Sequence, residues 1–342
     1  MLSDLSYDEI IEYASGKGLP KFRGDQIFDA IYNGKQLEEV TNLSKETKDL
    51  IKNDYPDYKI RKKFISKDGT QKFIVEFYDG NIVECVLMKY KYGYSLCLST
   101  QVGCRMGCKF CASTLNGLAR NLSAGELLGQ VLLINREIGG SKKERKITNI
   151  VLMGSGEPLD NYENVLKFLD LVCDEKGLNI SERNISLSTC GLVPQIYALA
   201  DEMLNITLTI SLHATTDEKR REIMPIANKY SIKEILEACK YYFEKTKRKI
   251  YFEYTLVKGV NDSNDDVKRL KTLLSGLMCH VNIIPLNEVK ERTLKGTGRL
   301  AAYDFCEKLK SQGVSATVRR TMGEDIAGAC GQLRNKILKD GI

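Results

Sequence analysis

The sequence predicts an α/β protein, in which a parallel sheet, open or curved into a barrel, follows a small helical N-terminal region. From residue 95 onward, short apolar strands alternate with amphipathic helices, a rhythm typical of repeated βα units. Before residue 58, apolar residues recur at helical spacing, and Ser44 and Gly16 are typical of helix ends. The chain has 342 residues, of which 43% are hydrophobic, and can therefore bury a real core. This excludes global disorder.

Residues 1–90 are expected to form a helical domain plus a linker hairpin. Three helices are predicted, at 6–13, 25–32 and 44–51. The pattern then changes to period two, and an Asp-Gly-Asn turn at 79–81 joins two apolar runs. That arrangement is typical of a β-hairpin.

In the remaining chain, each predicted strand except the last is followed by a helix. Ligands of such sheets bind at the carboxyl ends of the strands. The expected strands are 96–99, 147–153, 185–188, 206–212, 250–256, 280–285 and 316–320, and the expected helices are 123–138, 162–172, one near Pro194, 232–243, 265–274 and 303–310.

Composition narrows the class of protein. No apolar run approaches the roughly 18–20 residues of a membrane span, and the N-terminus lacks a secretory pattern. We therefore expect a cytoplasmic protein with no membrane partner. A net charge of +6 is compatible with a polyanionic partner but does not require one. Eleven cysteines without an export signal indicate metal binding or catalysis, whereas two histidines argue against a histidine-based zinc site.

A cysteine-rich loop directly follows the first core strand. Cys104, Cys108 and Cys111 form a C-x₃-C-x₂-C run. Three thiolates on a short loop can hold three irons of a [4Fe–4S] cube and leave the fourth iron open. A structural zinc ion would instead require four closed ligands. The spacing therefore predicts an iron–sulfur cluster with one vacant corner.

This loop resembles the cluster loop of the radical S-adenosylmethionine (SAM) superfamily. The resemblance implies that the open iron binds SAM, and that core residues 91–322 form a partial (β/α)6 barrel. The run Gly154-Ser155-Gly156-Glu157-Pro158 is similar to the superfamily's glycine-rich SAM contact. Glycine there would let the backbone approach the ligand closely.

A narrower resemblance covers nearly the whole chain and includes the helical N-terminal domain. It is to the RlmN-type RNA methyltransferases, which modify adenine C2, whereas the related Cfr-type enzymes modify C8. Pro158 and Pro285 fit the C2 pattern better. The matching blocks are C-R-M-G-C-K-F-C-A-S-T at 104–114, M-G-S-G-E-P-L at 153–159, S-L-S-T-C-G at 186–191, I-S-L-H at 210–213, C-H-V-N-I-I-P-L-N at 279–287 and A-C-G-Q-L at 329–333.

The resemblance also implies a mechanism that uses two SAM molecules per turnover. One methylates Cys330, in a C-terminal segment at 323–342. The other yields a 5′-deoxyadenosyl radical that removes hydrogen from this S-methyl group, and the resulting radical adds to the electron-poor C2. Glu84 would accept the C2 proton. Cys97 would then attack the Cys330 sulfur, forming a transient disulfide and releasing the methylated base.

Further expectations follow from the same resemblance. The substrates would be one adenosine near the peptidyl transferase centre of 23S rRNA and the adenosine 3′ to some tRNA anticodons. The N-terminal domain would contact RNA, the chain would be a monomer, and a flavodoxin or ferredoxin would donate electrons. The SAM contacts carry over to Gly156, Glu157, Ser188, Ser211, Leu212, His213 and Asn287.

The other cysteines and the basic residues have plainer interpretations. Basic clusters, including the tyrosine-interleaved run at 89–92, could bind phosphates and stack on an unpaired base. Two alternatives stay open: a C8-directed enzyme, and a non-catalytic RNA-binding protein with a structural metal. Six cysteines in apolar patterns are predicted to be core or near-core residues: Cys85, Cys173, Cys190, Cys239, Cys279 and Cys306.

Overall fold

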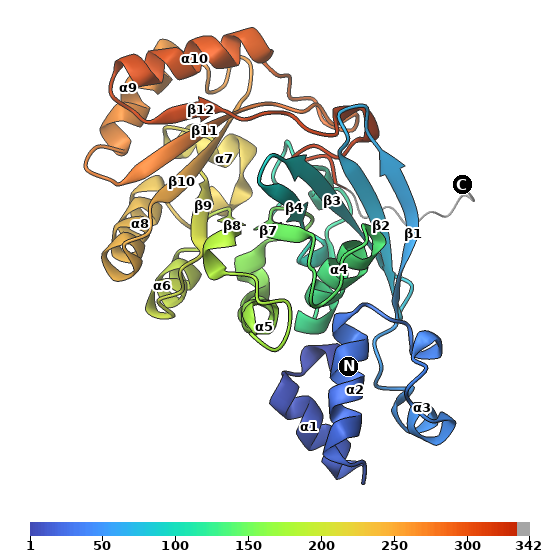
Figure 1. Ribbon diagram of the computed structural model, residues 1–342. Helices are drawn as coiled ribbons and strands as arrows, with labels where there is room; N and C mark the ends of the chain where they lie inside the picture. The colour runs from blue at the N-terminus through green and yellow to red at the C-terminus, as the bar shows by residue number, and fades with distance from the viewer. Residues whose placement is uncertain (334–342) are drawn as a thin grey trace.

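A single ten-stranded sheet runs through the computed structural model, which describes residues 1–333. Its strand order is β1-β2-β3-β4-β7-β8-β9-β10-β11-β12, with β1 and β12 as the two edges, so the sheet bends around an interior without closing (Figure 1). The strands from β4 to β12 are all parallel, whereas β1, β2 and β3 are antiparallel. The last residues of the predicted C-terminal segment, 334–342, lie outside the described part.

The parallel part confirms the predicted partial (β/α)6 barrel. Six strands are each followed by helical structure, and the short β12 comes after the sixth unit. The units are β4 (Gly93–Cys97) with α4 (Ala124–Glu137), β7 (Ile147–Leu152) with α5 (Tyr162–Cys173), β8 (Ile185–Thr189) with α6 (Val193–Asp201), β9 (Thr207–Ser211) with α7 (Asp217–Ile223) and α8 (Ile232–Thr246), β10 (Ile250–Leu256) with α9 (Asn264–Leu273), and β11 (Cys279–Pro285) with α10 (Arg299–Ser311), before β12 (Ala316–Val318).

The predicted hairpin forms, but it extends the barrel sheet instead of standing between two units. β1 (Tyr58–Ile65), β2 (Gln71–Phe77) and β3 (Ile82–Tyr90) pair in sequence, and β3 pairs with β4 so that Val86 lies opposite Cys97. One face of β3 explains this, because its alternate side chains are buried in the main apolar core. The hairpin therefore contributes one wall of the barrel.

The N-terminal helices pack at one end of the molecule (Figure 1). α1 (Tyr7–Gly16) starts with a capping box between Ser6 and Glu9, and α3 (Lys45–Ile51) is capped by Ser44. α2 (Lys21–Tyr32) starts earlier than predicted, directly after Pro20, a residue that favours a helix start. The Tyr32 hydroxyl donates to the Leu171 carbonyl on α5, which fixes these helices against the barrel.

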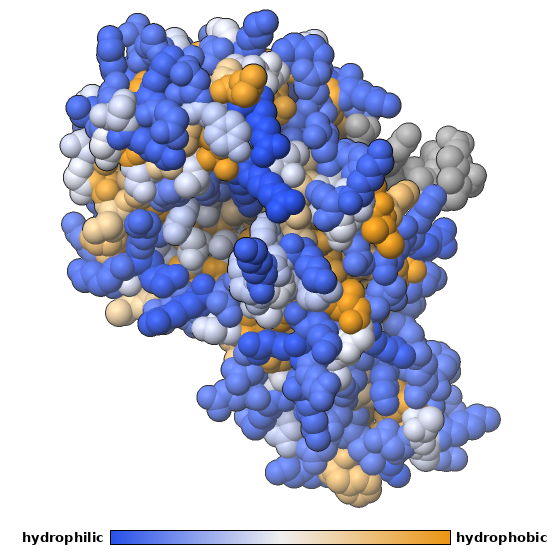
Figure 2. Space-filling view, turned by 45° about the horizontal axis from the view of Figure 1, so that its top comes forward, coloured by the Kyte–Doolittle hydropathy of each residue, from blue (hydrophilic) through white to orange (hydrophobic). Residues whose placement is uncertain are grey.

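The face drawn in Figure 2 is largely hydrophilic, and its apolar side chains appear as separate small groups. Within residues 1–333, none of the helices combines the length and apolar character that a membrane crossing requires.

Candidate active site

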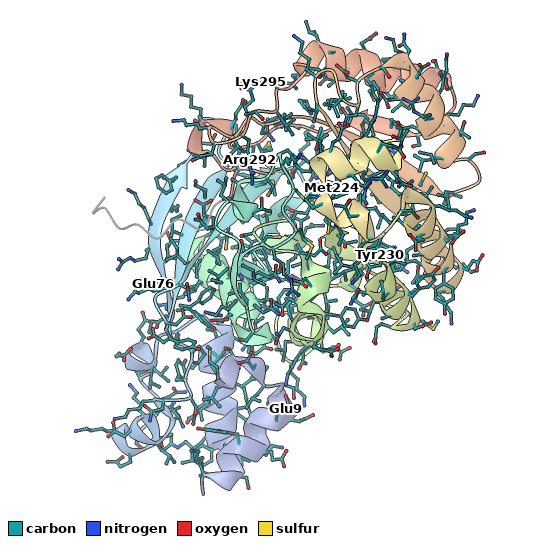
Figure 3. The ribbon with its side chains drawn as sticks, turned by 180° about the vertical axis from the view of Figure 1, so that it is seen from behind. Glu9, Glu76, Met224, Tyr230, Arg292 and Lys295 are labelled. Atoms are coloured by element: carbon teal, nitrogen blue, oxygen red, sulfur yellow. The ribbon has the colours of Figure 1, made fainter. Side chains whose placement is uncertain are left out.

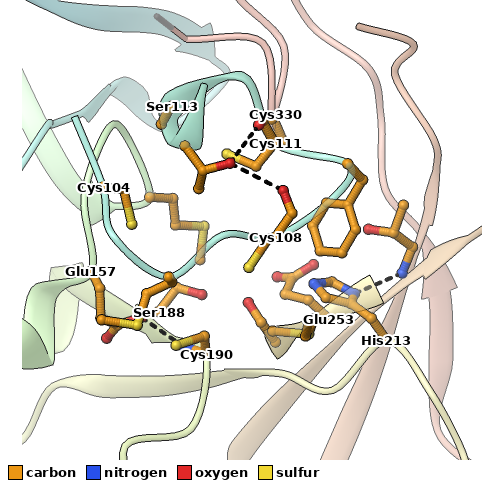
Figure 4. Close-up of a pocket in the computed structure, with 18 of the residues that line it drawn as sticks. Cys104, Cys108, Cys111, Ser113, Glu157, Ser188, Cys190, His213, Glu253 and Cys330 are labelled. Atoms are coloured by element: carbon orange, nitrogen blue, oxygen red, sulfur yellow. Dashed lines mark hydrogen bonds between the residues drawn. The ribbon is translucent and has the colours of Figure 1, made fainter. Parts of the chain in front are cut away.

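A cavity opens where the parallel strands end, as predicted for this architecture. Its wall comes from β7 to β12 and from the cysteine loop, and we call it the main cavity. All three loop cysteines line it together with Cys330 (Figure 4).

Met224 and Arg292, labelled in Figure 3, lie in segments that follow β9 and β11. Met224 lines the cavity, and the Arg292 guanidinium donates to the Cys111 carbonyl.

The cysteine loop is held by backbone contacts on both sides. Two short antiparallel strands, β5 (Gln101–Gly103) and β6 (Leu118–Asn121), close its base. The Lys109 amide donates to the Ile223 carbonyl at 2.9 Å, and the Cys111 amide to the Cys108 carbonyl at 3.1 Å. The loop therefore presents its thiols from a fixed frame.

The three thiols fit a cluster better than a single ion. Each is largely enclosed, and burial raises the pKa of Cys104 to about 12 and also raises that of Cys108. In residues 1–333, no three His, Cys, Asp or Glu side chains converge to hold one metal ion. A four-iron cube does not need such convergence, because it places each thiolate on a different corner. Iron binding would displace the thiol protons, as metal binding to cysteine requires.

The glycine-rich turn follows β7 and passes close to the strand beside it. A side chain on Gly154 would come within 2.4 Å of the Leu98 carbonyl oxygen, and Gly156 has φ +110°. Glycine is needed here because a side chain would collide with the neighbouring backbone. The close approach of a ligand, which we predicted from the sequence, would be a second reason. Glu157 accepts the Cys190 amide at 2.8 Å, while burial raises the pKa of its carboxyl group.

Most of the predicted SAM-binding residues meet in the main cavity. Ser188, Ser211 and Asn287 line it, as do Gly156 and Glu157. Leu212 is the exception, because its side chain lies in the apolar core and does not line the cavity.

His213 also lines the main cavity, in a left-handed backbone conformation with φ +53°. Its Nδ1 accepts the Thr255 amide at 3.0 Å. Burial, reinforced by Arg220, lowers the pKa of the imidazole to about 3, so the ring is neutral. It packs edge-on against Phe110 of the cysteine loop, with ring centres 4.9 Å apart.

A second, smaller cavity adjoins the first, and we call it the side cavity. Cys97 and Cys330 both line it. The main and side cavities share five wall residues: Met153, Ile284, Asn287, Arg319 and Cys330. Cys97 is buried on β4, whereas Cys330 is exposed and lies in a segment without regular structure. The geometry thus brings the three loop thiols, Cys97 and Cys330 to one connected space.

Comparisons with known proteins agree with this geometry. Residues 98–270 match the model of the radical SAM superfamily. A "probable dual-specificity RNA methyltransferase RlmN" from Clostridium botulinum (strain Eklund 17B / Type B) is 54% identical, over 98% of this chain and 96% of its own length. The chain belongs to the RlmN family of radical SAM RNA methyltransferases.

Other similar proteins also match this chain over nearly its full length. One from Lachnospira eligens is 50% identical over 99% of this chain and 97% of its own. The crystal structure of a radical SAM methyltransferase from Sphaerobacter thermophilus is 39% identical, with a TM-score of 0.92, covering 98% of this chain and 99% of that one. The non-catalytic interpretation is therefore wrong.

Glu84, expected from the RlmN resemblance as a proton acceptor, lies on β3 outside the walls of both cavities. It is buried and forms an ion pair of 3.0 Å with Lys72. The Lys72 ammonium group also reaches the Ala327 carbonyl oxygen at 3.4 Å. Glu84 is thereby connected, through Lys72, to the segment that carries Cys330.

The structure adds Arg319 and Glu253, which the sequence interpretation did not place in the site. In the sequence, Arg319 and the adjacent Arg320 resemble a basic surface cluster, yet Arg319 lines both cavities. Its guanidinium contacts a Glu253 oxygen at 3.0 Å and the Met153 sulfur at 3.4 Å. The sequence alone carries no signal that places Arg319 in the site, because its position depends on how the last strand pairs with β11. Cys190, correctly predicted as buried, also lines the main cavity.

Proposed function

We propose that this protein methylates C2 of a specific adenosine in 23S rRNA, near the peptidyl transferase centre, and of the adenosine 3′ to the anticodon in some tRNAs. The observation that carries the proposal is the position of Cys330. It lines the main cavity with the three loop thiols and the side cavity with Cys97. A methyl group on its sulfur could therefore face both partners.

Cys104, Cys108 and Cys111 would hold a [4Fe–4S] cluster, and the strand-end residues around them would hold SAM. When bound, these groups supply a methyl donor and a carbon radical able to remove hydrogen from an S-methyl group. Two SAM molecules would be consumed per turnover, with a flavodoxin or ferredoxin as the electron donor. The neutral His213 ring would line the SAM site without adding a positive charge. Glu157 would line the same site with a buried carboxyl group.

Cys330 would carry the methyl group and form the carbon–carbon bond. Its thiolate takes a methyl group from one SAM, and loss of one hydrogen from this group leaves a thiomethylene radical that adds to C2. The adduct would lose one electron, for which the oxidised cluster held by Cys104, Cys108 and Cys111 would be the acceptor. The C2 proton would pass to a base, for which Glu84 with Lys72 is our candidate.

Cys97 would release the product. Its thiolate attacks the Cys330 sulfur, and a disulfide forms as the sulfur–methylene bond breaks. The methylene carbon keeps the bonding pair and takes a proton to become the methyl group. Two electrons must then reduce the disulfide before the next cycle.

The N-terminal region, residues 1–90, would bind the RNA, and residues 91–322 would perform the chemistry. Because adenine C2 is hidden in stacked RNA, the target base must leave its stack to reach the cavities. We propose that the protein works as a monomer in the cytoplasm.

The test is anaerobic reconstitution with iron, sulfide, labelled SAM and unmodified RNA, followed by nucleoside mass spectrometry. We expect 2-methyladenosine at one position. 8-Methyladenosine as the sole product would overturn the C2 assignment in favour of Cfr-type chemistry. Zinc without sulfide in the purified protein would overturn the cluster assignment as well.

A further inference from the structure

Two tyrosines form a stacked pair at the turn that joins β3 to β4. The rings of Tyr90 and Tyr92 are 5.1 Å apart between centres and only 5° from parallel. Tyr92 is 63% exposed, whereas Tyr90 is half-buried. The proposed chemistry uses neither residue.

The inner ring of this pair belongs to the wall of the side cavity. Val86, Met88 and Tyr90 alternate along one face of β3, and all three line the cavity that holds Cys97 and Cys330. Val86 lies directly opposite Cys97 in the sheet. Tyr90 is four residues further along β3, about 13 Å away at strand spacing. The pair therefore extends outward from the reacting thiols to the protein surface.

Three exposed cations lie near the pair in sequence or along the same cavity. Lys91 lies between the two tyrosines, Lys89 precedes Tyr90 and contacts the Tyr94 ring at 6.0 Å, and Arg320 lines the side cavity. Among the carboxylates of residues 1–333, none forms an ion pair with these three side chains. A flat aromatic face bordered by available cations suits a base with its phosphates.

We propose that the Tyr90–Tyr92 pair is a stacking platform for the unpaired RNA base next to the target adenosine. This inference rests on the proposed function. The target base occupies the side cavity, and its neighbour continues the aromatic column on the exposed face of Tyr92. Lys91 and Arg320 neutralise the adjoining phosphates. Stacking accepts any base, so the platform holds the flipped conformation without reading the sequence of the RNA.

The experiment uses the reconstituted holoenzyme without SAM, so that no turnover occurs. The probe is an unmodified tRNA anticodon stem–loop that carries 2-aminopurine at the nucleotide 5′ or, in a second RNA, 3′ of the target adenosine. Stacking quenches 2-aminopurine fluorescence. Tyr92→Ala is compared with Tyr92→Phe at one fixed salt concentration, because affinity depends on salt.

Tyr303→Ala is the matched control for loss of an exposed tyrosine. Tyr303 is 43% exposed, lies on α10 outside residues 1–90 and lines neither cavity. If this control changes only the affinity for RNA, the stacking result is unaffected, because 2-aminopurine fluorescence reports stacking at one nucleotide.

We expect one of the two RNAs to be quenched by the wild type and by Tyr92→Phe and Tyr303→Ala, but not by Tyr92→Ala. Tyr92→Ala should raise Kd by about 5- to 150-fold, the usual range for loss of one stacked base. Equal quenching by Tyr92→Ala and the wild type at saturation would overturn the platform. If the wild type methylates adenosine while this result holds, only the platform fails; if it methylates no adenosine, the proposed function fails first.

Discussion

Cys97 and Cys330 line one cavity but are held in opposite ways. Cys97 belongs to the barrel sheet, with Val86 on one side and Val151 on the other. Cys330 is exposed in a segment held mainly by polar contacts: the Cys330 carbonyl accepts Asn287 at 3.0 Å, and the Leu333 carbonyl accepts Ser113 at 2.8 Å. Leu333 also packs against Val86 and Cys97. Cys97 is therefore held within the sheet, whereas Cys330 is held only through the contacts of its segment.

The difference matches the two chemical roles proposed for them. A sulfur that accepts a methyl group and then joins a base must be reached by large partners, so exposure suits Cys330. A sulfur that reacts only with another thiol derivative can stay buried. Burial raises the pKa of Cys97 to about 12, which protects it until a crosslink is presented.

The largest effect is expected from Cys330→Ala. Turnover should fall by about a thousandfold or more, because the atom that carries the methyl group is missing. The iron–sulfur absorbance and electron paramagnetic resonance signals should remain. Cys279→Ala, outside both cavities, is the matched control. Residual methylation at the wild-type rate would remove Cys330 from the mechanism.

Cys97→Ala should stop the reaction one step later. The S-methyl group forms and the base is attached, but nothing resolves the crosslink. We expect a covalent protein–RNA species on a denaturing gel and at most one turnover per enzyme. A normal multiple-turnover rate in this variant would contradict the resolving role.

A smaller effect should follow from changing the charge beside Cys97. Arg319 lowers the pKa of the Cys97 thiol against the larger effect of burial, and Tyr90 and Cys330 face the same space. Arg319→Gln should therefore raise that pKa. The thiolate fraction then falls about tenfold for each unit of pKa, and because a more basic thiolate is more nucleophilic, crosslink resolution slows about threefold. Glu253→Gln, which removes the partner of Arg319, should have the opposite effect.

The pH profile of crosslink resolution, measured by quenched flow, separates these outcomes from simple misfolding. The double variant Glu253→Gln/Arg319→Gln leaves no lone buried charge, whose cost can reach about 3–5 kcal/mol. Identical profiles for wild type and Arg319→Gln would show that the guanidinium does not act on Cys97.

The smallest effect is expected from Ser113→Ala. The variant loses one buried hydrogen bond to the Cys330 segment, worth about 1 kcal/mol. Hydrogen exchange of residues 327–333 should accelerate about fivefold, while exchange in β4 is unchanged. Equal acceleration in both regions would mean that the two thiols are not held independently.

The cluster loop and the strand ends were predictable because each depends on local spacing. Cys104, Cys108 and Cys111 needed only their separation and the preceding strand. Ser188 and Ser211 were implied by the family resemblance, and periodicity placed them at two strand ends.

The charged partners were not predictable, because they depend on register and on which side of the sheet a residue faces. Arg319 looks like a surface cation beside Arg320 until the last strand is placed against β11. The partner of Glu84 is Lys72, a diagonal neighbour across the β2–β3 pair, and composition cannot identify it. The role of the hairpin as a barrel wall likewise depends on the β3–β4 pairing.

The most direct test of the account follows the methyl group itself. Enzyme loaded at Cys330 with a trideuterated methyl group, then freed of labelled SAM, is given RNA and unlabelled SAM for one turnover. The account predicts that the first adenosine methylated carries two deuterium atoms, because one leaves with the radical and a proton replaces it. A product without deuterium, with the label still on Cys330, would contradict it.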